Sequence, residues 1–178
     1  MAMDSKKIAK LKTDSRHASM RGWFGFTLHE QMRRNKDIYL LTADLGYKLF
    51  DNIAKDFPDR FINVGASEQA MLGIAVGLAL EGKVPVCYSI TPFLLYRPFE
   101  WIRNYLDHEK IPVILVGSGR DKDYGDDGFT HYSEEAVQVL SLFPNIRQYW
   151  PDEKEEVPDM IKEMIFERKP CFISLKRG

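Results

Sequence analysis

Three side chains of this sequence stand where acid and base chemistry is feasible: Glu68, Asp127 and His131. Glu68 begins an apolar stretch that runs to about Leu80, so its carboxyl group is expected in the first turn of a helix. A carboxyl group there commonly complements the helix dipole or caps the turn. Asp127 and His131 share a segment rich in Gly and Asp. An Asp beside Gly is usually turn chemistry, whereas an imidazole titrates near neutral pH and can donate to a hydroxyl or carbonyl oxygen.

Arg97, Arg120 and Arg177 are candidates for binding a phosphate group. A guanidinium group binds two phosphate oxygens at once through its planar fork, so it suits such a site. The alternative for each of them is an ordinary solvated charge at the surface. Spacing and composition leave both interpretations open.

Phe93 and Tyr96 follow an apolar run and are candidates for stacking on a flat ligand. Aromatic rings stack well on other flat ring systems, although such residues more often lie in the core or at its rim. Asp44 precedes Leu45 and Gly46 in a turn-prone segment, where an Asp side chain often caps the turn itself. These alternatives also stay open on the residues alone.

Apolar runs alternate with helical spacings along the chain, which indicates an α/β fold with a mainly parallel sheet covered on both faces, a three-layer α/β/α arrangement. The expected strands are Ile38 to Leu41, Phe61 to Gly65, Val84 to Ile90, Pro112 to Gly117, a short one around Ile146, and Cys171 to Leu175. The first expected helix has Met20, Phe24, Leu28 and Met32 on its apolar face and Asp14 or Ser15 as its cap. A second helix ends near Pro58, and a third, capped by Ser67, runs from Glu68 to about Leu80. The remaining expected helices run through Phe99 to Ile102, from about Ser133 to Leu142, and from Glu153 to Arg168. We divide the chain into a polar lead, residues 1–15, and one domain, residues 16–178.

Loops that follow the carboxyl ends of parallel strands gather at one edge of the sheet, where ligands bind. On this pattern, residues 42–46, 65–69, 91–97 and 118–131 leave the same edge. The sequence has neither a P-loop nor a G-x-G-x-x-G fingerprint, so an ordinary phosphate-binding loop is not indicated.

The bulk composition is that of a globular domain and gives no charge signal for a partner. The 178 residues carry a formal net charge of -1, which indicates no general attraction to nucleic acid or to acidic membranes. Cys87 and Cys171 each fall in an apolar run and are expected to be buried thiols, not a disulfide or a zinc site. No apolar run approaches the roughly 20 residues needed to cross a bilayer, and no secretory signal is recognisable. We therefore expect a cytoplasmic protein.

Residues 57–69, with the sequence FPDRFINVGASEQ, resemble the signature at the start of the cofactor helix in the pyrimidine-binding domain of transketolases and deoxyxylulose-phosphate synthases. Further matching segments occur in the family's order and comprise residues 42–45, 92–97, 102–104, 125–131 and 144–146. Together the matches extend over about residues 16–178. The resemblance to the transketolase family is therefore global, and it implies a thiamine-diphosphate-binding fold of the pyrimidine type.

The resemblance implies that Glu68 hydrogen-bonds a ring nitrogen of the aminopyrimidine of thiamine diphosphate. A carboxylic acid suits this place because it can exchange a proton with the ring nitrogen, whereas an amide can only hydrogen-bond. The family also places an aromatic side chain on the aminopyrimidine, which implies this role for Phe93 or else for Tyr96. Asp44 resembles an acidic residue that approaches the thiazolium side of the cofactor across a dimer interface.

Asp127 and His131 match an Asp-Gly-x-Thr-His pattern that reaches the donor substrate and the reacting carbon in the family. Related enzymes also carry arginines near the positions of Arg97, Arg120 and Arg177 that hold a sugar phosphate. The chain departs from the family pattern in its bulky residues 92–96 and in Ser67, where many relatives have Ala. The identity of the sugar therefore stays open, including whether it is a sugar phosphate or a nucleotide-linked sugar.

Thiamine enzymes hold the diphosphate through a divalent metal that is bound by a Gly-Asp-Gly segment with a downstream Asn on a different domain. Residues 124–128 do not match that motif, because they belong to the substrate segment and lack the Asn. The resemblance therefore implies a split enzyme in which this chain binds no metal itself. A separate subunit would supply the diphosphate domain with Mg²⁺, and two such pairs would form an α2β2 heterotetramer.

The activity favoured by the resemblance is transfer of a two-carbon ketol unit from a ketose or ketose phosphate to an aldose acceptor. Arg97 and Arg120 favour instead the activity of a deoxyxylulose-phosphate synthase. A further alternative is a β-type subunit of a 2-oxo acid dehydrogenase. A non-catalytic transketolase-like binding subunit is an alternative of a different functional class. The presence of the acid Glu68 argues against it. A parallel-sheet binding module unrelated to thiamine would make the ordered matches a coincidence.

Overall fold

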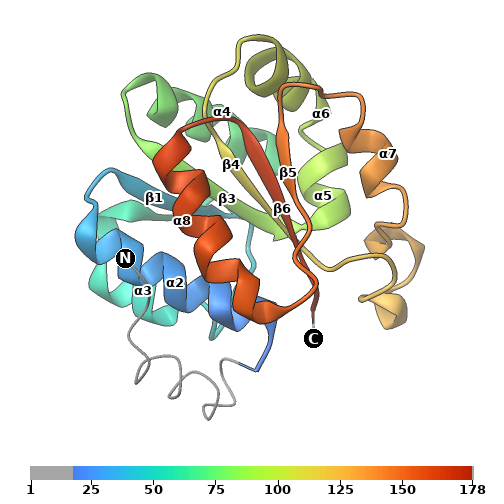
Figure 1. The fold of residues 1–178 in the computed structure, drawn as a ribbon, viewed down its shortest axis with the longest axis horizontal. Helices are drawn as coiled ribbons and strands as arrows, with labels where there is room; N and C mark the ends of the chain where they lie inside the picture. Colours follow the sequence, from blue (N-terminus) through green and yellow to red (C-terminus); the bar gives the residue numbers. More distant parts are fainter. Residues whose placement is uncertain (1–17, 178) are drawn as a thin grey trace.

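The computed structural model describes residues 18–177, which form a parallel sheet between two layers of helices (Figure 1). Its six strands are ordered β2-β1-β3-β4-β6-β5, and all neighbouring strands run parallel. The strands are β1 (Ile38–Thr42), β2 (Phe61–Asn63), β3 (Val84–Ile90), β4 (Ile114–Ser118), β5 (Arg147–Tyr149) and β6 (Cys171–Leu175). The predicted three-layer α/β fold is confirmed.

The helices connect the strands and cover both faces of the sheet. They are α2 (Met20–Arg34), α3 (Asp51–Asp56), α4 (Glu68–Leu80), α5 (Thr91–Tyr96), α6 (Phe99–Trp101), the π-helix η3 (Ile102–His108), α7 (Ala136–Leu140), α8 (Val157–Glu167), and the short 3-10 helices η2 (Pro58–Arg60), η4 (Gly125–Asp127), η5 (Phe129–His131) and η6 (Lys154–Glu156). Helix α4 and strands β3 and β6 have the predicted bounds.

Successive residues of the central strands alternate between two apolar clusters, one on each face of the sheet. On one face, Val86 and Ile173 pack with α2, α3 and α8. On the other face, Cys87 and Phe172 pack with α4, η3 and α7. Alternation of this kind is what a sheet buried on both sides requires. Cys87 and Cys171 are both buried free thiols, as predicted.

The N-terminal ends of α2 and α4 differ from the predicted caps. Ser19 caps α2, because its side chain accepts a hydrogen bond from the backbone N–H of Gly22 at 3.2 Å. The predicted caps Asp14 and Ser15 lie outside the described residues. Ser67 occupies the N-cap position of α4 but makes no side-chain capping bond, so that prediction was wrong. Its backbone N–H instead closes a turn onto the carbonyl of Gly65 at 2.7 Å.

The helix predicted through residues 99–102 is divided into three pieces, α5, α6 and η3. Pro98 stands between α5 and α6, and a proline has no N–H to continue the hydrogen-bond ladder. From Ile102 the chain widens into a π-helix that ends with a bond from Glu109 N to Asn104 O at 3.2 Å. The sequence pattern locates helical backbone here but not its interruptions.

Two later helices are shorter than predicted. Ser133 pairs with Asp121 in an isolated antiparallel bridge, so α7 begins only at Ala136. Before α8, Glu153 and Glu156 form a capping box around η6, and the α-helix proper starts at Val157.

Candidate active site

The carboxyl ends of the central strands lie side by side. Thr42 of β1 is in register with Asn63 of β2, and Ile90 of β3 is in register with Ser118 of β4. The four loops predicted to leave one edge of the sheet therefore do so. This edge is where an open parallel sheet binds its ligands.

Glu68 is a buried carboxylate at this edge, with 2% of its surface exposed. The hydroxyl of Ser89 in β3 donates to Oε1 of Glu68 at 3.1 Å. Nη1 of Arg97 donates to Oε2 at 2.8 Å. A buried carboxylate without such partners would destabilise the fold by several kcal/mol, so both contacts matter for where Glu68 points.

Arg97, Phe93 and His131 continue the cluster outward from Glu68. Cζ of Arg97 lies 3.8 Å from the centroid of the Phe93 ring, which is a cation–π contact. The ring of His131 meets Phe93 edge to face, with centroids 4.8 Å apart and planes at 66°. Helix α5 and its C-cap residue therefore bring the stacking candidate and the arginine together, and η5 in the segment after β4 adds the histidine.

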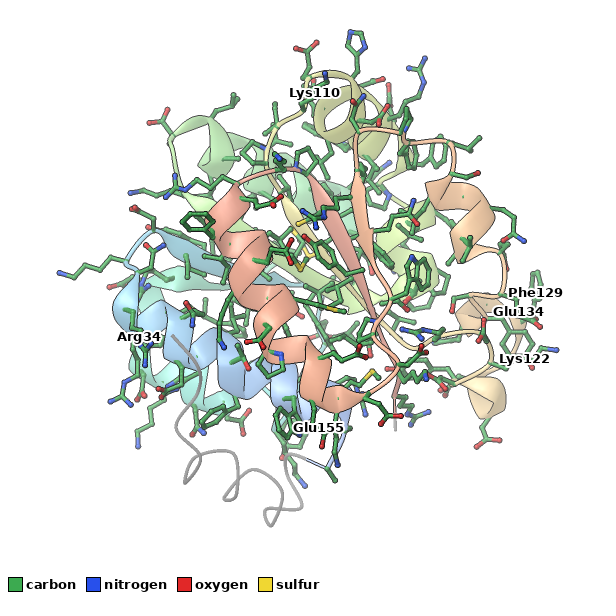
Figure 2. All side chains as sticks on the ribbon, viewed as in Figure 1. Arg34, Lys110, Lys122, Phe129, Glu134 and Glu155 are labelled. Atoms are coloured by element: carbon green, nitrogen blue, oxygen red, sulfur yellow. The ribbon has the colours of Figure 1, made fainter. Side chains whose placement is uncertain are left out.

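His131 lies in η5, and its orientation is restrained from two sides. Nδ1 is 3.0 Å from the hydroxyl of Thr130, the residue before it. The ring of Tyr124 lies at a centroid distance of 6.1 Å. Figure 2 shows that Lys122, Phe129 and Glu134 of the same segment project away from the body of the chain. The segment thus turns His131 toward the cluster and these three side chains outward.

Arg177 and Asp127 form a second, more exposed group beside the first. Nη1 of Arg177 lies 3.8 Å from Oδ2 of Asp127, and the two side chains are 44% and 49% exposed. The guanidinium lies over the ring of Tyr124, with Cζ 4.5 Å from its centroid. The backbone N–H of Arg177 donates to Asp123 at 2.8 Å. An ion pair this exposed is weak, so the guanidinium is accessible to an anionic ligand.

The Arg120 guanidinium is held by hydrogen bonds to Pro151 and Ser174 and by an ion pair with Asp152 at 3.7 Å. Its Nη2 donates to the carbonyls of Pro151 and Ser174, both at 2.9 Å, and its Nε donates to the hydroxyl of Ser174 at 3.2 Å. Only 14% of the side chain is exposed, and this burial lowers the pKa of Arg120. The predicted phosphate contact of Arg120 stays a prediction, and the geometry favours a structural link between the β4 loop and β6.

Tyr96 and Asp44 lie at the same edge of the sheet but outside the cluster. Tyr96 turns toward Glu135, and burial together with a hydrogen bond to Glu135 raises the pKa of Tyr96. Asp44 is exposed with φ at 55°, and its backbone N–H donates to Oδ1 of Asn63 at 3.0 Å. Of the two candidate aromatic residues, Phe93 is therefore the one that shares the Arg97 guanidinium with Glu68. The Asp44 carboxylate accepts a hydrogen bond from Nδ2 of Asn63 at 3.4 Å.

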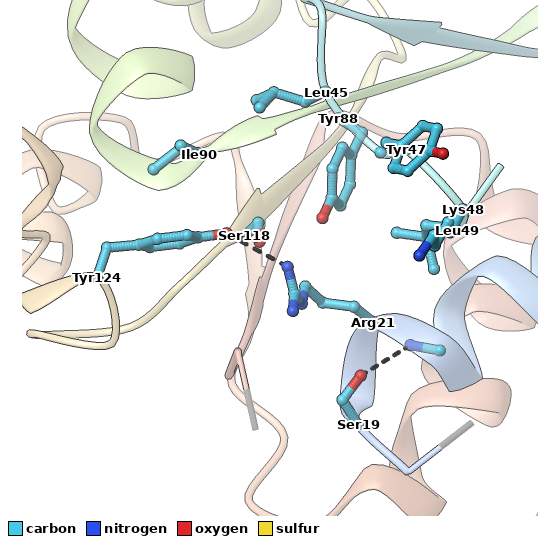
Figure 3. Close-up of a pocket in the computed structure, with 12 residues that line it drawn as sticks. Ser19, Arg21, Leu45, Tyr47, Lys48, Leu49, Tyr88, Ile90, Ser118 and Tyr124 are labelled. Carbon is cyan, nitrogen blue, oxygen red and sulfur yellow. Dashed lines mark hydrogen bonds between the residues drawn. The ribbon is translucent and has the colours of Figure 1, made fainter. Parts of the chain in front are cut away.

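A cavity of about 320 Å³ opens beside the Arg177 group, between the start of α2 and the ends of β3 and β4. Figure 3 shows Arg21 directed toward the hydroxyls of Ser118 and Tyr124. Nη1 of Arg21 lies 3.4 Å from the hydroxyl of Tyr124, which is itself 2.8 Å from that of Ser118. Burial raises the pKa of Tyr88 in the same cavity, so its hydroxyl keeps its proton.

Ser89 and Tyr124 are site residues that the sequence did not single out. Ser89 is a polar residue inside an otherwise apolar strand, which is a usable signal, because such a residue needs a buried partner. Tyr124 carries no comparable signal, since an aromatic residue in a polar loop is common.

Within residues 18–177, no group of three or more His, Cys, Asp or Glu side chains is placed to hold a metal ion. The same residues include no helix that is both long enough and apolar enough to cross a membrane.

Residues 16–178 match the family model for the transketolase pyrimidine-binding domain. The chain belongs to this family. A putative transketolase C-terminal section of Methanocaldococcus jannaschii is 30% identical over 168 residues, which are 94% of this chain and 53% of the relative. A 1-deoxy-D-xylulose-5-phosphate synthase of Dehalococcoides mccartyi is 32% identical over 157 residues, which are 87% of this chain and 24% of the relative.

Among solved structures, the chain is similar to one described as a split gene transketolase, inactive beta4 tetramer. The TM-score is 0.80 at 28% sequence identity, and the match covers 90% of this chain and 51% of the other. The chain thus spans about half the length of the split-type relatives it matches. Fold and family follow from these similarities together with the strand order described above.

Proposed function

We propose that this chain is a subunit of a thiamine-diphosphate-dependent, transketolase-like enzyme that transfers a two-carbon ketol unit from a ketose or ketose phosphate to an aldose. The observation that carries the proposal is that the buried Glu68 carboxylate and the Phe93 ring contact the same guanidinium, that of Arg97, at the carboxyl edge of the sheet. Family membership supports the class of cofactor. The reaction and the residue roles are our inference.

The residues present fit the aminopyrimidine end of that cofactor. The space between Phe93 and Glu68 holds a flat, hydrogen-bond-donating group, the guanidinium of Arg97. A protonated aminopyrimidine is likewise flat and donates a hydrogen bond. The aromatic face of Phe93 and the accepting oxygen of Glu68 therefore suit the ring in both shape and polarity.

In this proposal Glu68 accepts a hydrogen bond from the ring nitrogen and exchanges a proton with it. Ser89 fixes the orientation of the carboxylate through its bond to Oε1. Phe93 supports one face of the ring. When bound, the cofactor supplies the electron sink that stabilises negative charge on the transferred carbon unit.

His131 and Asp127 act on the substrate side. His131 lies against the edge of Phe93, so it reaches the space next to the proposed ring site and can donate to a carbonyl or hydroxyl oxygen. Arg177 is half-exposed, and its fork suits a phosphate or another anionic end of a sugar. Asp127 pairs with this guanidinium, and we assign it a contact to substrate hydroxyls.

The diphosphate end and its Mg²⁺ require a second subunit in this proposal. Residues 18–177 contain no acidic metal-binding group, and the relatives include a C-terminal section and a split-gene transketolase. Ile74 and Leu80 of α4 are 41% and 69% exposed, so this helix offers apolar surface for such a partner. We propose an α2β2 assembly, acting in the cytoplasm.

A deoxyxylulose-phosphate-synthase-like activity is the second candidate, because that enzyme is among the relatives. Pyruvate as the donor would distinguish it from ketol transfer. A 2-oxo acid dehydrogenase β-type subunit would instead pass its product to a separate acyl carrier. A non-catalytic subunit would bind the cofactor without turnover.

The deciding experiment is a ketol-transfer assay of the chain with a diphosphate-domain partner, thiamine diphosphate and Mg²⁺. We expect activity only when both subunits are present, with a loss of at least about a hundredfold for Glu68→Ala. Glu155→Ala is the matched control, since Glu155 is an exposed glutamate of η6 (Figure 2). Turnover of pyruvate but not ketoses would favour the synthase, and cofactor binding without any turnover would favour the non-catalytic subunit.

A further inference from the structure

We propose that the side chain of Arg97 stands in for the aminopyrimidine ring and must move aside when the cofactor binds. The inference rests on the proposed function, because it takes Glu68 and Phe93 as the two groups that hold the ring. It gives Arg97 a role other than the predicted contact to a sugar phosphate.

The first argument is the stacking contact. Cζ of Arg97 lies 3.8 Å from the centroid of Phe93, which is the separation of two flat groups in face-to-face contact. A guanidinium is planar and delocalised, and it stacks on aromatic faces as a ring does. Arg97 therefore covers the face of Phe93 that a second ring would use.

The second argument is the hydrogen bond to the same carboxylate. Ser89 already donates to Oε1 of Glu68, so Oε2 is the oxygen that faces the space above Phe93. Nη1 of Arg97 donates to that oxygen at 2.8 Å. A ring nitrogen bound to Glu68 would need the same atom from the same side, so the two donors exclude each other.

The third argument is that Arg97 is the member of the cluster able to leave. Its side chain is 45% exposed, while that of Glu68 is 2% exposed. Within residues 18–177 its polar contact is the one to Glu68. The long side chain can rotate into solvent by giving up this ion pair and its contact with Phe93, whereas Glu68 is fixed by α4 and Ser89.

The consequence is a competition between Arg97 and the cofactor ring. Arg97 keeps the buried carboxylate of Glu68 paired until a ring takes over the contact, which avoids an unpaired buried charge. The same pairing weakens the apparent affinity of the chain for the ring. Removing Arg97 should therefore tighten binding, which is the opposite of what loss of a ligand contact does.

The test is a titration with thiamine, which carries the aminopyrimidine without the diphosphate, followed by ligand-observed NMR. For Arg97→Ala we expect a dissociation constant lower by about threefold to tenfold, the range expected when a half-exposed ion pair and its cation–π contact cease to compete. Phe93→Ala and Glu68→Ala should both weaken binding. Arg33→Ala, which removes a 61% exposed arginine of α2, is the charge-matched control and should leave the dissociation constant unchanged.

Arg97→Lys is a second variant that keeps a cation for Glu68 but lacks the flat group, and we expect its affinity to fall between those of the wild type and Arg97→Ala. If Arg97→Ala does not fold, the direction of the change in Arg97→Lys decides alone. Equal or weaker binding by the Arg97 variants overturns the inference, and the proposed function then stands on the Phe93 and Glu68 results. Absence of thiamine binding in every chain, Arg97→Ala included, overturns the proposed function and the inference together.

Discussion

Ser89 in strand β3 donates its hydroxyl to Oε1 of Glu68 in helix α4 at 3.1 Å, and both residues are buried. The bond links the central part of the sheet to the first turn of the helix that follows β2. It fixes which carboxylate oxygen faces the cluster, because the other oxygen is left for Arg97. Helix α4 thus sets the position of the candidate catalytic acid, and a strand residue sets the orientation of its carboxylate.

The Ser89 bond predicts a specific loss of stability in Ser89→Ala. A hydrogen bond to a buried charged group is lost and one carboxylate oxygen is left without its partner, so the free energy of unfolding should fall by about 1–3 kcal/mol. Urea denaturation measures this difference. Ser141→Ala is the control, because Ser141 is exposed and its hydroxyl donates to the carbonyl of Gln138 in the preceding helix α7. This substitution should change stability by less than about 0.5 kcal/mol. Equal effects of the two substitutions would contradict the prediction.

The bounds of α4 followed from the sequence, whereas the partners of Glu68 did not. An apolar run after a Gly turn, with a carboxyl group at its start, is enough to begin a helix at Glu68. That Ser89 and Arg97 meet this carboxylate depends on how β3 lies against α4, which local spacing does not encode. The same limit explains Arg120, whose donors reach the carbonyls of Ser174 and Pro151 only because β4 and β6 are neighbours.

Arg60 provides another case in which tertiary packing determines the role of a charged side chain. Its guanidinium donates to the carbonyls of Met32, Asn35 and Ile38 at 3.1, 3.0 and 3.3 Å, at the carboxyl end of α2 and the start of β1. It also lies over the ring of Phe57 at 4.5 Å. The sequence marked Arg60 only as part of a family signature.

Arg60→Met should lower the free energy of unfolding by about 1–3 kcal/mol, because three carbonyl groups lose a charged donor. Arg60→Lys should recover only part of this, since an ammonium group cannot reach three carbonyls in the fork geometry of arginine. Chemical denaturation of both variants measures the difference, with Arg33→Met in α2 as an exposed arginine control. Full recovery by lysine would show that charge and not geometry is what matters here.

The pair of Asp37 and Lys83 predicts an acid-dependent contribution to stability. Lys83 Nζ lies 2.9 Å from Asp37 Oδ1, and this hydrogen bond and charge hold the pKa of Asp37 below its ordinary value of 3.8. Because the folded-state pKa is lowered, the contribution is fully present above pH 3.8 and is lost as the pH falls through the folded value. The pair joins the residue before β1 to the residue before β3.

Asp37→Asn should therefore be less stable than the wild type above pH 3.8, and the difference should shrink as the pH falls below that value. Urea unfolding at a series of pH values measures it. Lys83→Met should show the same dependence, and the double variant should add little to either single change. A difference that stays constant through the acid range would mean that the ion pair contributes no linked stability.

Gly117 and Gly77 give a pair of glycine substitutions with opposite expected signs. A Cβ at Gly117 in β4 would lie 2.6 Å from Oγ1 of Thr91 and 2.9 Å from ring atoms of Phe172. Thr91 cannot yield freely, because the same hydroxyl donates to the carbonyl of Gly119 at 2.6 Å. At Gly77 in α4 a Cβ meets nothing within 4 Å.

We expect Gly117→Ala to lower the free energy of unfolding by about 1–3 kcal/mol through overpacking. Gly77→Ala should raise it by up to about 1 kcal/mol, since alanine restricts the unfolded chain and favours the helix. Denaturant unfolding of the two variants measures both signs under one set of conditions. A destabilising Gly77→Ala would indicate that contacts outside α4 constrain the helix at this position. A neutral Gly117→Ala would require β4 and α5 to move apart, which would relax the edge of the sheet that carries the Glu68 cluster.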